Sequence, residues 1–513
     1  MNSKVNTLIP ILIISFLSLS SGPTRTSDPG LLTYDSTSTE TEDLALRIDT
    51  YLTKSTENGF SGSALVAVEG QIILSKGYGW ADRDGKIPNT SSTVFNIGSV
   101  TKQFTAAGIL KLMEQGELNL SDKIARFFPE APDDKKDITL HQLLTHTSGI
   151  SPATGGFRYD EAGKEQFLEE FFQSELLSEP GENHRYANAN YIMLTAILER
   201  VSGQEYASFL RTSLWEPANL ERTGYKSFLF PSDDFAHGYF YHYTSGAWKD
   251  WGITQDHLTD TKNHWYSIGK GDLYSTVEDL YKWHQALEPN EVLQPETLTL
   301  MESPHVAENE SGTSHYGYGW AIFKSPSGTK IVTHNGSNGI YFADLIRYVE
   351  DDVVVIVLSN AILGNSSQNV AWEISRMVFN SNYQPTPLSK NIYELIHEFM
   401  RSHEPAQAEQ LTDYIEQKIA KEEWDRSILN RLGFALIDRE EQPAWGLEWL
   451  KLNVKLFPED GNLWDSLGEA YYKYDQKEKA LESFKKALQY GESSDNCYWC
   501  DNSEEKIELI TNN

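Results

Sequence analysis

The stretch FNIGSVTKQFTA, Phe95 to Ala106, places a serine three residues before a lysine at the point where the chain enters a helix. Gly98 precedes Ser99, and the segment that follows, TAAGILKLMEQGEL, has apolar residues at helical spacing. Ser99 is therefore predicted at a helix N-terminus, among free backbone N–H groups and at the positive end of the helix dipole. Lys102 lies one turn further along the same face, within reach of the Ser99 hydroxyl.

This pair has two interpretations. A lysine whose pKa is lowered by burial and positive neighbours can take the proton of a serine and make it a nucleophile, while the serine N–H helps to hold an oxyanion. Alternatively, Ser99 only caps the helix and Lys102 is solvated. The pattern S-x-x-K alone does not decide, because it starts at five serines: Ser99, Ser267, Ser327, Ser483 and Ser503. Among them, Ser99 follows a glycine and opens a long apolar-periodic helix.

A second stretch, HRYANANYIML, places Tyr186 and Asn188 two residues apart, just before an apolar helix. A phenol beside a lysine can exchange protons with a nucleophile and a leaving group. An asparagine amide can bind both the substrate and the lysine. The alternative is that the two side chains only decorate a loop.

A third stretch, THNGSNG, follows the predicted strand Lys330–His334. An edge that ends in small residues can pair with an extended substrate, and the N–H of Ser337, after Gly336, is a candidate second oxyanion donor. His334 would give this edge a polar or positive group. The alternative is a hairpin turn with a surface histidine.

Strands are predicted at both ends of one region, with helices between them. The β-prone runs Ser63–Val68 and Gln71–Gly77 flank Glu69-Gly70, which suits a tight hairpin. The segment from Thr93 to Leu287 is mainly helical, and helices are also predicted at Glu42–Thr53 and Ser367–Phe379. Further strands are predicted at Gly317–Lys324, Lys330–His334, Tyr341–Val349 and Asp352–Ser359. The pattern indicates one α+β domain, residues 42–380, in which terminal strands meet in an antiparallel sheet flanked by helices.

Residues 381–390 are interpreted as a linker, and residues 391–513 as a small all-α domain. The tetratricopeptide pattern fits this region at Trp464, Leu467, Gly468, Tyr471, Ala480, Phe484 and Ala487. A weaker copy upstream comprises Leu429, Leu432, Gly433, Leu436 and Pro458. A generic helical hairpin is the alternative.

In the first domain, the aromatic-rich stretch Gly238–Ile253 is expected to overhang the site or to pack on itself.

The N-terminus has the pattern of an export signal over residues 1–20, with Lys4 before the apolar run Leu8–Leu19, followed by a flexible leader, residues 21–41. A membrane anchor or a strand is the alternative. The mature protein is expected to be exported, periplasmic or extracellular, without stable membrane insertion.

Cys497 and Cys500, the chain's two cysteines, are expected to form a small terminal disulfide staple. The formal charge of −31 argues against nucleic-acid and anionic-membrane partners.

Taken together, the ordered motifs resemble the serine β-lactamase-related family of class C β-lactamases, D-Ala-D-Ala carboxypeptidases and related esterases. Its members carry S-x-x-K, then Y-x-N, then K-T-G or H-x-G. Here these motifs are Ser99-Val100-Thr101-Lys102, Tyr186-Ala187-Asn188 and His334-Asn335-Gly336. The resemblance extends over about residues 45 to 380 and includes the segments LLTHTSGI, WEPANLERTGY, GDLYSTVEDLYKW and YGYGW.

The resemblance implies that Ser99 is the acylated nucleophile, that Lys102 and Tyr186 share general-base and general-acid duty, and that Asn188 positions them. It also implies that His334 and Gly336 line the substrate edge and that no metal or cofactor is required. The third triplet is H-N-G rather than K-T-G, which argues against efficient β-lactam hydrolysis. Ala187 stands where members often have serine.

Two functions follow as hypotheses. The first is an exported serine hydrolase that acts through an acyl-enzyme on an ester, amide or D-amino-acid peptide. The second is a catalytically silent cell-wall peptide-binding or scaffold protein whose helical tail recruits a protein partner. Retention of Ser99, Lys102 and Tyr186 favours the first, and the tail can bind a protein partner in either case.

Overall fold

The computed structural model describes residues 38–156, 162–225, 234–257, 265–287, 291–361, 366–418, 425–439, 442–491 and 497–512. The predicted signal peptide and most of the predicted leader lie outside these residues. Helix α1 runs over Ser38–Glu57, so it begins inside the expected leader and is longer than the predicted Glu42–Thr53. Among the described residues, no helix is both long enough and apolar enough to cross a membrane.

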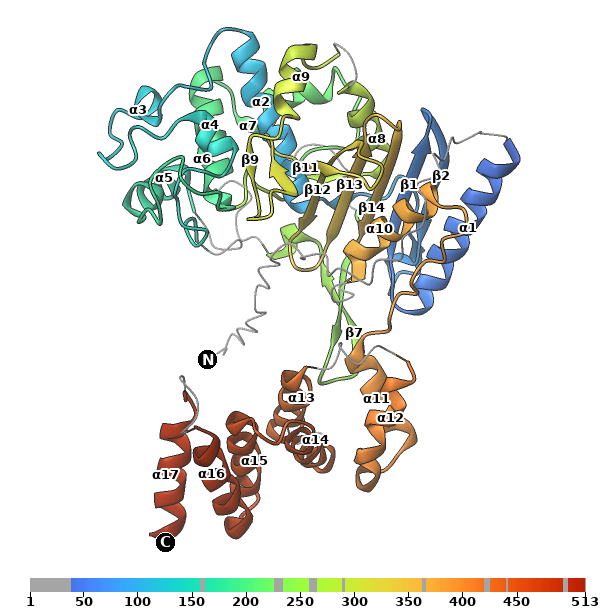
Figure 1. Ribbon diagram of the computed structural model, residues 1–513, viewed down its shortest axis with the longest axis vertical. Coiled ribbons are helices and arrows are strands. Elements are labelled where there is room, and N and C mark those ends of the chain that lie inside the picture. Colours follow the sequence, from blue (N-terminus) through green and yellow to red (C-terminus); the bar gives the residue numbers. More distant parts are fainter. Residues whose placement is uncertain are drawn as a thin grey trace.

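The central element is an eight-stranded sheet with the order β2-β1-β14-β13-β12-β11-β10-β9 (Figure 1). All of its neighbouring strands run antiparallel. The bounds are β1 Gly62–Val68, β2 Gln71–Tyr78, β9 Val306–Ala307, β10 Ser314–Tyr316, β11 Ala321–Lys324, β12 Lys330–Ser337, β13 Phe342–Tyr348 and β14 Val353–Ser359. Strand β1 pairs with β14, with Leu65 opposite Ile356, so the prediction that strands from both ends of the region share one sheet is confirmed.

Two details of the strand predictions change. The predicted strand Gly317–Lys324 is shorter, because residues 317–320 form the turn between β10 and β11, where Gly319 adopts a φ of 77°, and the strand begins at Ala321. Strand β12 extends to Ser337 rather than ending at His334. The β1–β2 hairpin is as predicted, since Glu69 (φ 50°) and Gly70 (φ 70°) both adopt the left-handed backbone that a tight two-residue turn requires.

Helices cover both faces of the sheet, which explains why β1 and β14 are buried throughout. On one face, Ala64 and Val66 pack with α1 and with α10, Ser366–Phe379, which confirms the predicted helix there. On the other face, Leu65 packs in a core that includes Phe104 of α2, Thr101–Glu114, and Trp283 of α8, Val277–Ala286. Figure 1 shows this layered arrangement, with the larger helical lobe beside β9 to β13. The predicted α+β class is confirmed.

The aromatic-rich stretch is a β-hairpin, β6 Gly238–His242 and β7 Ala247–Gly252, that extends toward the helical tail (Figure 1). At its tip, the backbone carbonyl of Tyr243 accepts a hydrogen bond of 2.7 Å from His397 Nε2 of the tail. The Tyr243 ring lies 5.3 Å from the ring of Tyr393. The expectation that this stretch overhangs the site or packs on itself is therefore wrong for the tip, because the half-buried ring of Tyr243 packs against the second domain.

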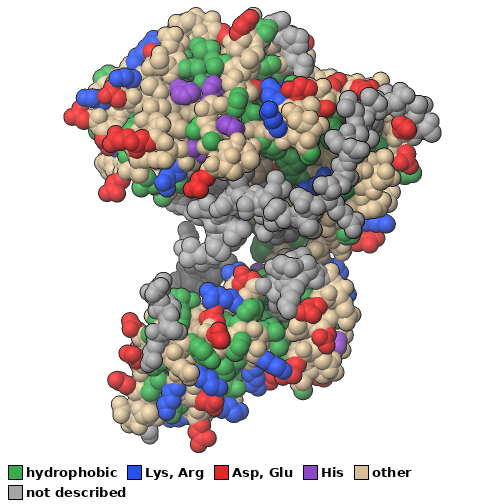
Figure 2. All heavy atoms as spheres, in the orientation of Figure 1, with side chains coloured by type: hydrophobic (Ala, Val, Ile, Leu, Met, Phe, Trp, Pro, Cys, Tyr) green, Lys and Arg blue, Asp and Glu red, His purple; other side chains and the backbone are tan. Residues whose placement is uncertain are grey.

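The tail is all-α, as predicted. Its helices are α11 Ile392–Ser402, α12 Leu411–Glu416, α13 Arg426–Asp438, α14 Pro443–Leu456, α15 Gly461–Lys473, α16 Lys477–Gly491 and α17 Cys500–Thr511. Gly433 of α13 lies against Leu450 of α14, and Gly468 of α15 lies against Phe484 of α16. The two glycines thus occupy equivalent close contacts in successive helical pairs, while the tetratricopeptide assignment itself stays a prediction. Figure 2 shows acidic and basic side chains interspersed on the visible face of this tail.

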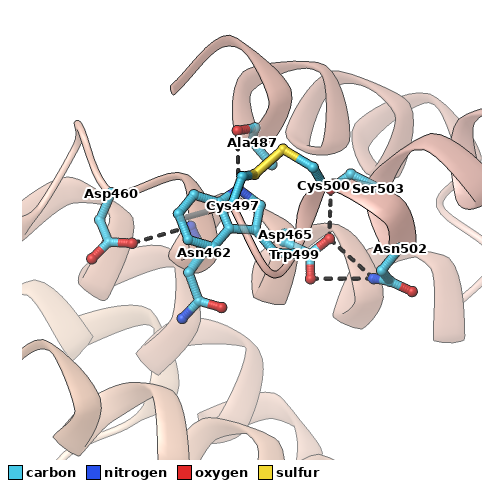
Figure 3. The surroundings of a disulfide bond; sticks show 9 residues. All are labelled: Asp460, Asn462, Asp465, Ala487, Cys497, Trp499, Cys500, Asn502 and Ser503. Carbon is cyan, nitrogen blue, oxygen red and sulfur yellow. Dashed lines mark hydrogen bonds between the residues drawn. A yellow bond between two sulfur atoms is a disulfide. The ribbon is translucent and has the colours of Figure 1, made fainter. Parts of the chain in front are cut away.

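A disulfide joins Cys497 and Cys500 at the start of the last helix, in agreement with the expected staple (Figure 3). Between the two cysteines, the indole of Trp499 donates a hydrogen bond of 3.2 Å to the carbonyl of Ala487. Just beyond them, the Ser503 hydroxyl donates to Asp465 Oδ1 at 2.5 Å. The disulfide therefore belongs to a set of contacts that fix α17 against α15 and α16.

A buried ion pair secures β13 to the helical lobe. The guanidinium of Arg347 pairs with Glu302, at side-chain exposures of 1% and 4%, and Arg347 Nε donates to His284 Nδ1 at 2.9 Å. Burial raises the pKa of Glu302, but Arg347 and Lys330 outweigh it, so that this pKa lies below its usual value. The carboxylate is therefore charged at neutral pH and depends on its partners.

Replacing Arg347 by methionine is expected to reduce the free energy of unfolding by about 3–5 kcal/mol, because Glu302 stays buried without its main partner. The control is Lys330→Met, which removes the partner that is one-third exposed and should cost less than about 1 kcal/mol. Urea unfolding followed by tryptophan fluorescence measures both. Equal stabilities of the Arg347→Met protein and the wild type would contradict the assignment of this pair as a structural anchor.

Candidate active site

Ser99 lies in a short 3-10 turn, Gly98–Val100, that leads directly into α2. Gly98 adopts a φ of 51°, and its N–H donates to the side chain of Asn96 at 2.9 Å. The left-handed glycine lifts the chain out of β5, Phe95–Asn96, and turns it into the helix. Ser99 is half-buried at this turn, which places its hydroxyl at the start of α2 as the sequence predicted.

Lys102 is completely buried, and its amine joins three segments of the chain. Nζ donates to Ser99 Oγ at 3.2 Å, to Asn188 Oδ1 at 2.9 Å and to the backbone carbonyl of Lys270 at 2.6 Å. All three acceptors are uncharged groups. The amine is thus held next to the serine hydroxyl by an amide and a carbonyl, and the interpretation of Lys102 as a solvated surface residue is wrong.

Tyr186 and Asn188 reach the same amine from the start of α6, Asn188–Ser202. Ala187 between them is extended (φ −130°, ψ 119°) and caps the helix. Asn188 bonds Lys102, and Lys102 Nζ lies 4.8 Å from the centre of the Tyr186 ring. The two side chains therefore converge on one lysine rather than decorating a loop.

The end of strand β12 crosses the Ser99 turn at backbone contact. A Cβ on Gly336 would lie 2.0 Å from the carbonyl oxygen of Ile97 and 2.8 Å from the backbone nitrogen of Ser99. A Cβ on Gly98 would lie 2.5 Å from the backbone nitrogen of Ser337. The main-chain nitrogens of Ser99 and Ser337, the two predicted oxyanion donors, are thus brought beside each other at one crossing.

His334 lies on the same strand, almost fully buried at 5% exposure. Its Nδ1 is 2.6 Å from the carbonyl of Asn335, so it carries the proton, and its Nε2 accepts from the Tyr316 hydroxyl at 3.0 Å. Burial, with Lys102 nearby, lowers the pKa of His334 to about 3. The imidazole is neutral at physiological pH, so the expected polar edge is present and the positive one is wrong.

All seven predicted site residues therefore lie together around Lys102 and the Ser99 turn: Ser99, Lys102, Tyr186, Asn188, His334, Gly336 and Ser337. Sequence reasoning missed Lys270, whose carbonyl binds Lys102, and Tyr316, which binds His334. Tyr316 stood in the segment YGYGW, which indicated family membership but no contact. Lys270 belongs to another S-x-x-K pattern, and its contribution is a backbone carbonyl, which leaves no signal in side-chain type.

Comparisons with known proteins agree with this geometry. The family model "Beta-lactamase" matches residues 48–375. Penicillin-binding protein 4* of Bacillus subtilis (strain 168) is 33% identical over 314 residues, which cover 59% of this chain and 68% of that protein. The teichoic acid D-alanine hydrolase of Staphylococcus aureus is 26% identical over 326 residues, 63% of this chain and 75% of that protein.

Among solved structures, the octameric penicillin-binding protein homologue from Pyrococcus abyssi is similar with a TM-score of 0.57 and 26% identity. The similarity covers 66% of this chain and 78% of that one. The fold and these similarities thus define a domain of the beta-lactamase-like serine hydrolase class. The chain belongs to the beta-lactamase family, and the family match ends before the helical tail.

Gly336→Ala is expected to abolish at least about 99% of any hydrolytic activity, since a displacement of about 1 Å in an active site can cost a factor of about 100. The added methyl meets backbone atoms of Ile97 and Ser99, which cannot move aside as a side chain would. The matched control is Gly271→Ala, whose Cβ would find its nearest neighbour, the backbone of Gly98, at 3.8 Å. Initial rates with an activated ester measure both, and an active Gly336→Ala protein would refute the close crossing.

Proposed function

We propose that this protein is an exported serine hydrolase that forms an acyl-enzyme on Ser99 with an ester, amide or D-amino-acid peptide. The observation that carries the proposal is the position of Lys102, whose buried amine contacts both Ser99 Oγ and Asn188 Oδ1. The Tyr186 ring beside the amine completes a proton relay next to the hydroxyl. A nucleophile with a base in contact and a third group that orients the base is the arrangement that covalent catalysis requires.

In the first half of the reaction, Lys102 acts as the neutral amine: its two N–H groups stay on Asn188 Oδ1 and the Lys270 carbonyl, and its lone pair takes the proton of Ser99 Oγ as that oxygen attacks the substrate carbonyl carbon. The oxygen of the tetrahedral intermediate is stabilised by the N–H groups of Ser99 and Ser337. The carbon–leaving-group bond then breaks, and the leaving group takes a proton from the Lys102–Tyr186 pair. The product of this half is an ester between the acyl group and Ser99.

In the second half, water attacks the acyl carbon and gives its proton to the same pair. The bond from the carbon to Ser99 Oγ breaks, the serine recovers a proton, and the carboxylic acid leaves. Asn188 keeps the lysine amine beside the serine in both halves, because its side-chain oxygen accepts from that amine. These steps need no metal or cofactor.

The neutral third motif supports substrates without a carboxylate at that edge. His334 is uncharged and its Nε2 is engaged with Tyr316, so it offers no cation where K-T-G proteins have a lysine. Efficient β-lactam hydrolysis is therefore not part of the proposal. The name of the staphylococcal relative, a teichoic acid D-alanine hydrolase, supports a D-amino-acyl ester as one candidate substrate.

Export and a role for the tail are parts of the same proposal. The N-terminal sequence pattern and the disulfide support an oxidising compartment outside the cytoplasm. The paired helices α13–α14 and α15–α16 support recruitment of a protein partner by the tail, whether or not the first domain is active. The scaffold hypothesis without catalysis has no comparable support, because the buried amine of Lys102 contacts Ser99 and Asn188 and lies beside the Tyr186 ring.

Ser99→Ala is expected to lower the rate of ester hydrolysis by a factor on the order of a thousand or more, since the nucleophile is lost. The control is Ser327→Ala, which removes the first residue of another S-x-x-K pattern in an exposed turn between β11 and β12 and should leave the rate unchanged. Steady-state kinetics on an activated ester measure both. Full activity of the Ser99→Ala protein would rule out Ser99 as the nucleophile and with it the proposed mechanism, whereas an inactive wild type would favour a scaffold role for the domain.

A pair of peptides tests the substrate preference. N-acetyl-D-alanyl-D-alanine and its C-terminal amide differ only in the charge of the leaving group. The amide is expected to be cleaved with a kcat/KM at least equal to that of the acid, because no cation faces the carboxylate from His334. A preference for the acid above about tenfold, or 1.4 kcal/mol, would show that the site holds a carboxylate and would contradict this assignment.

A further inference from the structure

The segment THTSG, Thr145 to Gly149, is bound along its length to the chain around Tyr186. Its backbone carbonyls accept hydrogen bonds at both ends: that of His146 from Arg185 N–H at 2.8 Å, and that of Gly149 from Leu177 N–H at 2.8 Å. The Ser148 hydroxyl donates to Asn190 Oδ1 at 2.7 Å. The segment therefore packs against the turn that contains Tyr186.

His146 is the residue of this segment whose side chain contacts the turn directly. It is completely buried and adopts a φ of 56°, a left-handed conformation that is unusual outside glycine. Its Nδ1 accepts from the backbone N–H of Ala187 at 3.2 Å and faces Asn190 Nδ2 at 3.3 Å. Its ring lies 4.3 Å from the ring of Tyr186. One side chain thus holds both the backbone and the ring of the Tyr186 turn.

The hydrogen bonds fix the protonation state of this ring. A backbone N–H can only donate, so Nδ1 accepts and the proton of the neutral imidazole is on Nε2. Burial, and then Lys102, His184 and His334, lower the pKa of His146 well below its usual value. Within the described residues Nε2 has no hydrogen-bond partner. A neutral ring without a contact to Ser99 holds neighbours in place rather than moving protons.

We propose that His146 is the positioning residue of Tyr186: its Nδ1 fixes the Ala187 N–H and, through that backbone, the position of the phenol ring relative to Lys102. This inference rests on the proposed function, in which Tyr186 shares proton transfer with Lys102. The left-handed backbone is retained at this position because it directs the imidazole under the turn.

Three variants separate the effect of the hydrogen-bond acceptor at position 146 from the effect of side-chain packing there. Asparagine tolerates a left-handed backbone and places an amide oxygen near the position of Nδ1, so His146→Asn should keep most of kcat. Glycine suits the backbone but removes the acceptor and the ring, so His146→Gly should lower kcat by about 10- to 100-fold with little change in KM. Added imidazole should restore part of that loss. Ser148→Ala, which releases Asn190 and the Ile150 N–H but leaves the Ala187 contact in place, should have a smaller effect in the same direction.

Amide hydrogen exchange supplies a measurement that does not depend on activity. In the full chain, the Ala187 amide should exchange faster in His146→Gly than in the wild type and stay protected in His146→Asn. Equal exchange and equal kcat in the wild type and His146→Gly would overturn the inference while leaving the hydrolase intact. An inactive wild type would instead refute the proposed function, and the exchange result would still decide whether His146 holds the turn.

If His146→Gly does not fold, the comparison of His146→Asn and Ser148→Ala with the wild type remains decisive. Loss of kcat in His146→Asn as large as that expected for the glycine variant would show that an acceptor at this position is not what the turn requires. Retained kcat in His146→Asn, with a lower kcat in Ser148→Ala and an unchanged melting temperature, is the outcome that the proposal predicts.

Discussion

The structure depends on one backbone crossing, where strand β12 passes over the turn that carries Ser99. Gly336 and Gly98 meet there with no room for a side chain on either. The strand belongs to the C-terminal part of the first domain and the turn to its N-terminal part, and the shared sheet connects them through β1 and β14. The two oxyanion donors therefore come together only when both parts have folded, and neither part contains a site by itself.

The second constraint is electrostatic. The buried amine of Lys102 is held by a hydroxyl, an amide and a backbone carbonyl, and its neighbours His146 and His334 are both kept neutral. Burial and the lysine itself are the causes of the two lowered histidine pKa values. The two histidines thus add no positive charge around the amine, and His334 gives no cationic anchor for a substrate carboxylate at the third motif.

Much of this could be predicted from the sequence, because the chemistry is concentrated in side chains at fixed spacing. Ser99 and Lys102 are one helical turn apart, and Tyr186 and Asn188 flank one extended residue, so local geometry determined how each pair points. The sheet followed from runs such as Val353–Ser359, which are apolar because both faces are covered. Three features of the site could not be predicted because they depend on tertiary contacts. They are the Lys270 carbonyl that binds Lys102, the Tyr316 hydroxyl that binds His334, and the burial that keeps His334 neutral. The hairpin from Gly238 to Gly252 was missed because its aromatic residues pack against a domain more than a hundred residues further along the chain.

The central claim is that Ser99 is an activated nucleophile, and covalent labelling tests it most directly. The folded full chain would be treated with a fluorophosphonate and the adduct mapped by peptide mass, with Lys102→Ala in parallel. A single adduct on Ser99, formed much more slowly in the Lys102→Ala protein, is the predicted result. No adduct on the folded protein, or an adduct on another serine, would contradict the account.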